Sequence, residues 1–175
     1  DHYVNMTLEN IEDGNPVAVY KSGSNWGGFI AVTLNNLRVG ALSYFFGIFL
    51  GIGTFYILLI NCTRLGAFQY IFYQNNVFWE SVRGIWIHGS MEIFAMIIEA
   101  GAGFILGASI LFPQTFSRLN SFKIGFQNSF KIFLSTMPFT FAAGFLEGYI
   151  TRYSMEMPNY LSVGIILITL SIISF

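Results

Sequence analysis

The 175-residue chain is 54% hydrophobic and 18% aromatic, has only 10% charged residues and carries a formal net charge of −1. Soluble domains average about a quarter charged residues, so this composition excludes an ordinary soluble domain and indicates a multi-pass membrane protein. The eight Lys and Arg residues are scattered singly, which excludes a basic surface for nucleic acid. The single cysteine excludes an intrachain disulfide framework and a multi-cysteine metal site.

Residues 1–25 are the predicted water-facing segment, and residues 26–175 are expected to form one helical membrane domain. Within the first segment, Val4, Leu8 and Ile11 follow an i, i+4, i+7 spacing, which predicts a short amphipathic helix near the membrane surface. The chain starts without Met and ends inside an apolar run, so we expect it to be a piece of a longer protein.

The first spanning helix is expected at about 39–60, because the chain is uncharged there over a length that crosses a bilayer. A polar turn precedes it, formed by Asn35, Asn36 and Arg38. Small residues recur on one face of the predicted helix, and small residues let a second helix approach closely in lipid. This face carries Gly40, Ser43, Gly47, Gly51 and Thr54.

Residues 65–79 are expected to form a re-entrant or interfacial segment. This uncharged stretch is short and contains four side-chain amides, whereas a spanning helix needs about 20 predominantly apolar residues. Non-helical chain at membrane depth is tolerated where it is buried in protein. The sequence therefore predicts that this segment returns to the face from which it entered.

The second half of the chain offers three further spans. One is expected at 85–112, stopping before a proline that cannot continue the helix, and the next at 132–151 with a kink at Pro138. The stretch 113–131 between them carries basic residues without an acid, which predicts a cytoplasmic loop. With a last apolar run at 159–175, the expected fold is an all-α membrane bundle of about four spanning helices plus the re-entrant segment.

The ionisable side chains inside the predicted spans are the candidate functional residues. A charged group at the membrane centre costs about 2.5 to 3.5 kcal/mol on insertion scales, so such groups usually face the bundle interior. His88, Glu92 and Glu99 lie within about 40° of one another on one helix face. A matching polar stripe on the third predicted span consists of Thr136, Thr140, Glu147 and Thr151.

We expect the two stripes to meet in one polar seam. Such a seam could exchange protons or hold a cation, or its side chains could be hydrogen-bonded and fix the register of the helices; the sequence favours the last reading. A metalloprotease helix needs a second His four residues after the first, and Glu92 stands there. A mixed site with His88, Glu92, Glu99 and Glu147 would suit Mn or Fe, but the sequence predicts neither a metal, a cofactor nor catalytic residues.

Two motifs resemble those of the stage II sporulation protein M family. One is the His-Gly-Ser-Met-Glu sequence of residues 88–92, and the other is the Leu-Glu-Gly-Tyr-Ile-Thr-Arg sequence of residues 146–152. The resemblance covers most of the chain, but Glu99 stands where the family prefers a small residue, and Cys62 where a glycine is expected. The site residues expected from the stripes, the small-residue faces and the resemblance are the intramembrane network His88, Glu92, Glu99, Thr140, Glu147 and Arg152, the packing glycines Gly40, Gly47, Gly51, Gly103 and Gly107, and the loop motif Asn35, Asn36, Arg38 and Asn61.

The resemblance implies a polytopic bacterial protein with a non-enzymatic role in the cell envelope; sporulation members are associated with recruiting peptidoglycan-degrading proteins during engulfment. The first hypothesis is a scaffold or assembly subunit in the cytoplasmic membrane, in contact with lipid and with other membrane or envelope proteins, or with further copies of itself. The alternative is a channel or proton-coupled transporter that uses the intramembrane His and Glu residues as its ion site.

Overall fold

The computed structural model describes residues 2–16, 18 and 23–174, and all regular elements among them are helical. The α-helices are α1 (His2–Glu12), α2 (Asn25–Phe45), α3 (Ile52–Gln74), α4 (Phe78–Leu111), α5 (Arg118–Ser135), α6 (Met137–Phe145) and α7 (Asn159–Ser174). Three short turns complete them: the 3₁₀ turn η2 (Phe46–Ile48), the π-helical turn η3 (Leu146–Ile150) and the 3₁₀ turn η4 (Thr151–Tyr153).

The predicted all-α membrane bundle is confirmed. Four helical segments are long and apolar enough to cross a membrane, namely 25–48, 52–74, 78–111 and 118–153, whereas α7 is a shorter apolar helix of 16 residues. The expected amphipathic helix at the start of the chain is also present, as α1.

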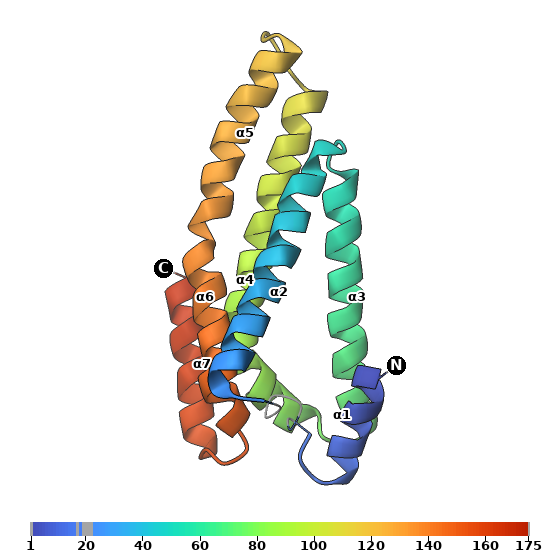
Figure 1. Ribbon diagram of the computed structural model, residues 1–175, viewed down its shortest axis with the longest axis vertical. Helices are drawn as coiled ribbons and strands as arrows, with labels where there is room; N and C mark the ends of the chain where they lie inside the picture. The colour runs from blue at the N-terminus through green and yellow to red at the C-terminus, as the bar shows by residue number, and fades with distance from the viewer. Residues whose placement is uncertain (1, 17, 19–22, 175) are drawn as a thin grey trace.

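Two helical hairpins make up the bundle (Figure 1). Helices α2 and α3 form the shorter one, and α4 forms the longer one with α5 and α6, which follow each other end to end. The central helix is α4, which contacts α2, α3, α5, α6 and α7. The expected kink coincides with the break between α5 and α6, where Pro138 occupies the first turn of α6.

The first span predicted from the sequence, 39–60, is wrong because the chain reverses inside it. Helix α2 ends at Phe45, and α3 begins at Ile52. The backbone at Leu50 and Gly51 adopts positive φ angles of 60° and 82°, which turn the chain back on itself. Every residue from 46 to 51 is apolar or glycine, so hydropathy gives no sign of this turn.

The prediction that residues 65–79 form a re-entrant segment is also wrong. Residues 65–74 continue α3, and α4 begins at Phe78. The side-chain amides that suggested a polar interruption are accommodated locally: the Ser81 hydroxyl donates to Gln69, and the amide of Asn75 donates to the carbonyl of Ile71 at the helix end. Polar side chains therefore do not prevent this helix from being a candidate span.

The cytoplasmic loop predicted at 113–131 is largely helix. Only residues 112–117 connect α4 to α5, as expected from the helix stop before Pro113. Ser121, Gly125 and Ser129 recur every fourth residue on the buried face of α5. A Cβ atom on Gly125 would overlap the side chain of Ser109, so this glycine lets α5 pack tightly on α4. The basic residues lie on the exposed face.

The two hairpins are joined by aromatic packing and by polar contacts. Tyr44 of α2 is fully buried and stacks on Phe133 of α5 with ring centroids 4.9 Å apart. Its hydroxyl lies 3.0 Å from that of Ser129. On the other side of α4, the Ser90 hydroxyl donates to Thr169 of α7 at 2.9 Å. Hydrogen bonds between polar side chains thus connect helices that lipid alone would not hold together.

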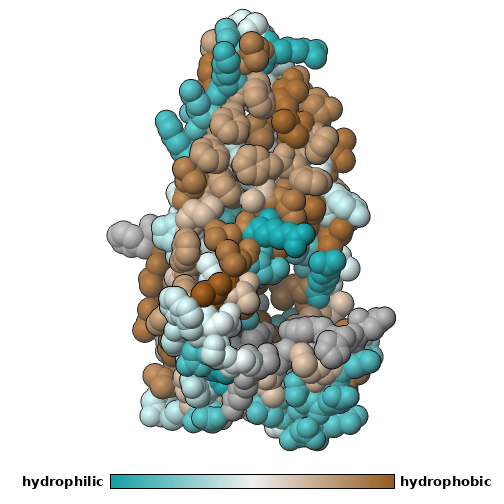
Figure 2. Space-filling view, in the orientation of Figure 1, coloured by the Kyte–Doolittle hydropathy of each residue, from teal (hydrophilic) through white to brown (hydrophobic). Residues whose placement is uncertain are grey.

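The surface follows the expected pattern of a membrane protein. In Figure 2 apolar residues cover much of the middle of the visible face, and hydrophilic residues gather mainly at the lower end and along the upper part of α5. The 34 residues of α4 give a helix of about 51 Å, longer than a hydrocarbon core of about 30 Å. Helix α4 is therefore longer than that core is thick.

Candidate functional site: a polar cavity between α2, α3 and α4

A cavity of about 480 Å³ lies between α2, α3 and α4, and Figure 2 shows a hollow in the lower half of the molecule. Its walls are largely apolar, with Val32, Leu65 and Ile85 among them. The polar and ionisable side chains that line it are Asn35, Asn36, Asn61, Gln69, His88, Glu92 and Glu147. The two motifs separated in the sequence therefore meet at one cavity.

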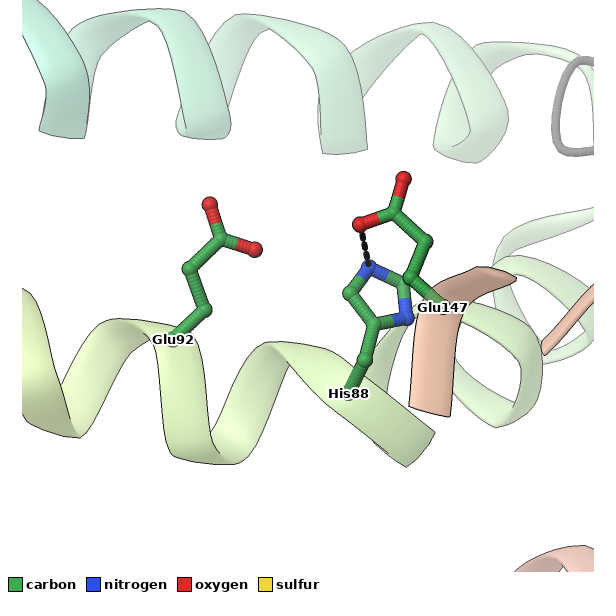
Figure 3. Close-up of side chains that lie close together, drawn as sticks. All are labelled: His88, Glu92 and Glu147. Atoms are coloured by element: carbon green, nitrogen blue, oxygen red, sulfur yellow. Dashed lines mark ion pairs between the residues drawn. The ribbon is translucent and has the colours of Figure 1, made fainter. Parts of the chain in front are cut away.

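His88 anchors the site from α4. Its side chain is buried, with 3% of the residue exposed. The Nδ1 atom lies 2.9 Å from the Thr151 hydroxyl oxygen, and the Nε2 atom lies 3.5 Å from a carboxylate oxygen of Glu147 (Figure 3). Both ring nitrogens thus face partners from the chain that follows α6, so the imidazole is held in one orientation.

Glu147 reaches the imidazole because of the π-helical turn η3, which spans residues 146–150. Such turns are rare and frequently occur at functional sites. Glu147 lies inside the turn and Thr151 directly after it, so one distorted turn supplies both partners of His88. The sequence predicts the polar stripe but does not reveal this change of helical register.

Glu92 lies one helical turn beyond His88 on α4 and points into the same space between α4 and α3 (Figure 3). One nitrogen or oxygen atom from each of His88, Glu92 and Glu147 lies within 4.8 Å of the others. Among the described residues that line the cavity, none is Lys or Arg. The cluster therefore combines two carboxyl groups with one imidazole, and none of the described residues along the cavity wall is basic.

Glu99 lies further along the seam and outside this cluster. It lines a second cavity of about 70 Å³, together with Thr140, and Glu92 borders both cavities. The Glu99 carboxylate is buried and accepts a hydrogen bond of 2.9 Å from the Thr136 hydroxyl. It also lies so close to Gly40 that a Cβ atom there would overlap it. Its contacts join α4 to both α2 and the α5–α6 junction.

The expected loop motif is not a loop. Asn35 and Asn36 lie within α2 and Asn61 within α3, and all three line both cavities. The Asn36 side chain is half-buried there and interacts with the carboxyl group of Glu92. Arg38 is exposed and does not line either cavity. Sequence reasoning found these amides but not their role, because it placed them before a span.

Arg152 connects the end of the second motif to the start of α2. Its guanidinium donates to the side-chain oxygen of Asn25 and, at 2.9 Å, to the carbonyl of Gly23. The residue is 8% exposed. Arg152 therefore holds the first turn of a helix that lines the cavity.

The packing glycines close the seam beyond Glu99. A Cβ atom on Gly47 would overlap the backbone of Gly103, and one on Gly107 would overlap the backbone at Gly51. Thr54 reinforces this contact by donating its hydroxyl to the carbonyl of Ser43 at 2.7 Å. Backbone therefore lies directly on backbone at these two positions.

Comparison with known proteins agrees with the resemblance noted in the sequence. The family model for stage II sporulation protein M matches residues 2–152, which include both cavity motifs and three of the four candidate spans in full. No curated protein and no solved structure matches the chain. The match covers most of the 175 residues. The chain therefore belongs to the stage II sporulation protein M (SpoIIM) family of bacterial membrane proteins.

Proposed function

We propose that this chain is a non-enzymatic scaffold or assembly subunit in the bacterial cytoplasmic membrane, and that it binds a protein partner through the tip of the α4–α5 hairpin. The observation that carries the proposal is the exposed apolar surface of this tip. Figure 1 shows the hairpin reaching well beyond the turn between α2 and α3. Four large apolar side chains are exposed there: Leu111, Phe112, Phe116 and Leu119.

The residue composition of the tip is similar to that of protein-binding surfaces. Phe112 is 68% exposed and lies at the end of α4, a helix longer than the hydrocarbon core is thick. Arg118 and Lys123 are exposed nearby, and the sequence from 113 to 145 contains no acidic residue. Aromatic and Arg side chains are enriched at protein interfaces. The composition of the tip therefore predicts a protein partner with an apolar surface and an acidic rim.

The closed seam supports a structural role for the intramembrane network. The cavity contains ionisable groups, but beyond Glu99 the glycine contact between Gly47 and Gly103 brings backbones together. A channel needs a polar path that reaches both faces of the membrane. The packing of η2 on α4 favours a bundle fixed in register over an open conduit.

Co-purification from native membranes tests the proposal. We expect the tagged chain to enrich a specific envelope protein, and Phe112→Ala/Phe116→Ala to lose that protein while remaining folded. The matched control is Phe55→Ala/Phe141→Ala, which removes two similarly exposed aromatic side chains from α3 and α6. Equal enrichment by all three proteins would contradict a role for the hairpin tip.

The alternative function, a channel or proton-coupled transporter, is favoured by the cavity and by His88, Glu92 and Glu147 along its wall. Proton and cation flux into liposomes that contain the purified chain distinguishes the two functions. A scaffold gives no flux, and its Glu92→Gln and Glu147→Gln variants still fold and bind the partner. Flux that disappears in a folded Gln variant would favour transport.

A further inference from the structure

We infer that His88, Glu92 and Glu147 form a binding site for one divalent first-row transition-metal ion, of the Mn²⁺, Fe²⁺ or Zn²⁺ class. The sequence alone argues against a metal, because no second His follows His88 on its helix. The structure changes this conclusion, since the π-helical turn η3 brings a ligand from a distant part of the chain to the imidazole. This inference goes beyond the proposed function and does not depend on it.

The three side chains offer a suitable set of donor atoms. One imidazole nitrogen and two carboxylate oxygens can approach within 4.8 Å of one another. Imidazole suits Zn and Fe, and carboxylate suits Mn, so a mixed set selects this class of ions. Three protein ligands leave coordination positions open on the cavity side. Water can fill them, and Asn36 and Asn61 also line that cavity.

The spacing between His88 and Glu147 fits ligands that share an ion. Their Nε2 and Oε2 atoms are 3.5 Å apart, longer than a charge-assisted hydrogen bond of about 2.7 to 2.9 Å. Two ligands bound tetrahedrally at about 2.1 Å from an ion lie about 3.4 Å from each other. Glu92 completes the set by moving closer, because its ligand atom lies within 4.8 Å of the other two, and rotation of its unbranched side chain supplies this movement.

Thr151 orients the imidazole as the partners of metal ligands usually do. A ligating His almost always engages its second ring nitrogen with another group, which fixes the tautomer and the orientation of the ring. Here Nδ1 contacts the Thr151 hydroxyl, and Nε2 is left facing Glu147. The hydroxyl is itself fully buried, so it holds the ring from a fixed position.

The charge of the three ligands matches one divalent ion. Carboxyl groups bind a metal ion as carboxylates and His binds it as neutral imidazole, so the ligands of a bound ion carry −2 together. Among the described residues along the cavity wall there is no Lys or Arg. A single divalent cation makes the occupied site neutral, which avoids the cost of unbalanced charge inside a membrane protein, and it connects α4 to the chain after α6.

Titration with Co²⁺ tests the site, because the visible spectrum of bound Co²⁺ reports the atoms around it. The full chain is purified in detergent, stripped with a chelator and titrated. We expect saturable binding of one Co²⁺ per chain. His88→Gln and Glu147→Gln should weaken binding by at least about tenfold, and Thr151→Val by about tenfold. Glu99→Gln is the matched control, since Glu99 is buried on the same helix but lies outside the cluster; it should bind Co²⁺ as the parent does.

The outcomes separate this inference from the proposed function. Absence of saturable Co²⁺ binding by the folded parent chain overturns the metal site whatever the variants do, and so does equal loss of binding in Glu99→Gln and His88→Gln. If His88→Gln or Glu147→Gln fails to fold, Glu92→Gln and Glu147→Asp replace them, and unchanged Co²⁺ binding in both would also overturn the site. Binding of the partner at the hairpin tip is measured separately, because it does not require the ion.

Discussion

Gly47 and Gly103 touch backbone to backbone, since a Cβ atom on Gly47 would overlap the carbonyl group of Gly103. This contact holds the turn between α2 and α3 against the C-terminal half of α4. This pair of glycines therefore allows the two hairpins to pack closely at this point.

We predict that Gly103→Ala destabilises the bundle by about 1 to 3 kcal/mol, because the added methyl group meets the Ser43 carbonyl and the Thr54 hydroxyl, both 2.5 Å from the Cβ position. The measurement is the midpoint of thermal unfolding in detergent. Gly101→Ala is the control on the same helix, where a Cβ atom meets nothing within 4 Å. Its unfolding midpoint should stay unchanged or rise slightly. Equal midpoints for the two variants would contradict this packing.

The turn at 46–51 and the connection after α3 should lie on opposite faces of the membrane, because α3 has the length and composition of a span. Single cysteines at Phe49→Cys and Asn76→Cys, in a Cys62→Ser background, report this with a thiol reagent that cannot cross the membrane. We expect labelling of one position from outside intact cells and of the other only after disruption. Labelling of both from the same side would restore the re-entrant segment expected from the sequence.

How far the sequence predicts the fold depends on where the polar residues lie. The end of α4 before Pro113 follows from proline's missing N–H donor, whereas α4 begins at Phe78, seven residues before the start expected at residue 85. Hydropathy does not predict the reversal at 46–51, because this segment contains no polar residue. The turn is instead stabilised by its contact with α4, which only the folded chain provides.

The site shows the same limit. Helical periodicity places His88 and Glu92 on one face of their helix. It also predicts a second polar stripe, which includes Glu147, on the span at 132–151. Two things cannot be read from that period: the π-helical turn that presents Glu147, and the amides of α2 and α3 along the cavity wall. Sequence reasoning treated Asn35 and Asn61 as flanks of a span, because a polar residue at a predicted boundary looks the same as one inside a protein cavity.

Gly40 and Glu99 provide a test of packing by paired substitution. Gly40→Ala should destabilise the bundle by about 1 to 3 kcal/mol, because the new Cβ atom overlaps the buried Glu99 carboxylate. In a Glu99→Ala background the same substitution fills vacated space and should cost much less. Thermal unfolding of the four proteins gives the coupling between the two positions. Additive effects would show that the carboxylate does not occupy the space above Gly40.

Arg152 is expected to control the stability of the first turn of α2. Arg152→Lys keeps the charge, but a single ammonium group cannot reproduce the planar fork that reaches both Asn25 and the carbonyl of Gly23. Hydrogen exchange should therefore accelerate at the amides of residues 25–30 in the variant. Arg64→Lys, at an exposed position on α3, serves as the control and should leave these amides unchanged. Equal exchange in Arg152→Lys and the parent would show that this pairing does not stabilise the helix.

Photo-crosslinking in living cells tests the central claim, that the tip of the α4–α5 hairpin binds a protein. The photoreactive residue p-benzoylphenylalanine replaces Phe112 in one protein and Phe141 in another, since both side chains are exposed but lie on different parts of the bundle. The scaffold account predicts one discrete protein adduct at position 112 and none at position 141, and Phe116→Ala should reduce the yield of that adduct. Identical products at both positions, or only lipid adducts at position 112, would contradict it.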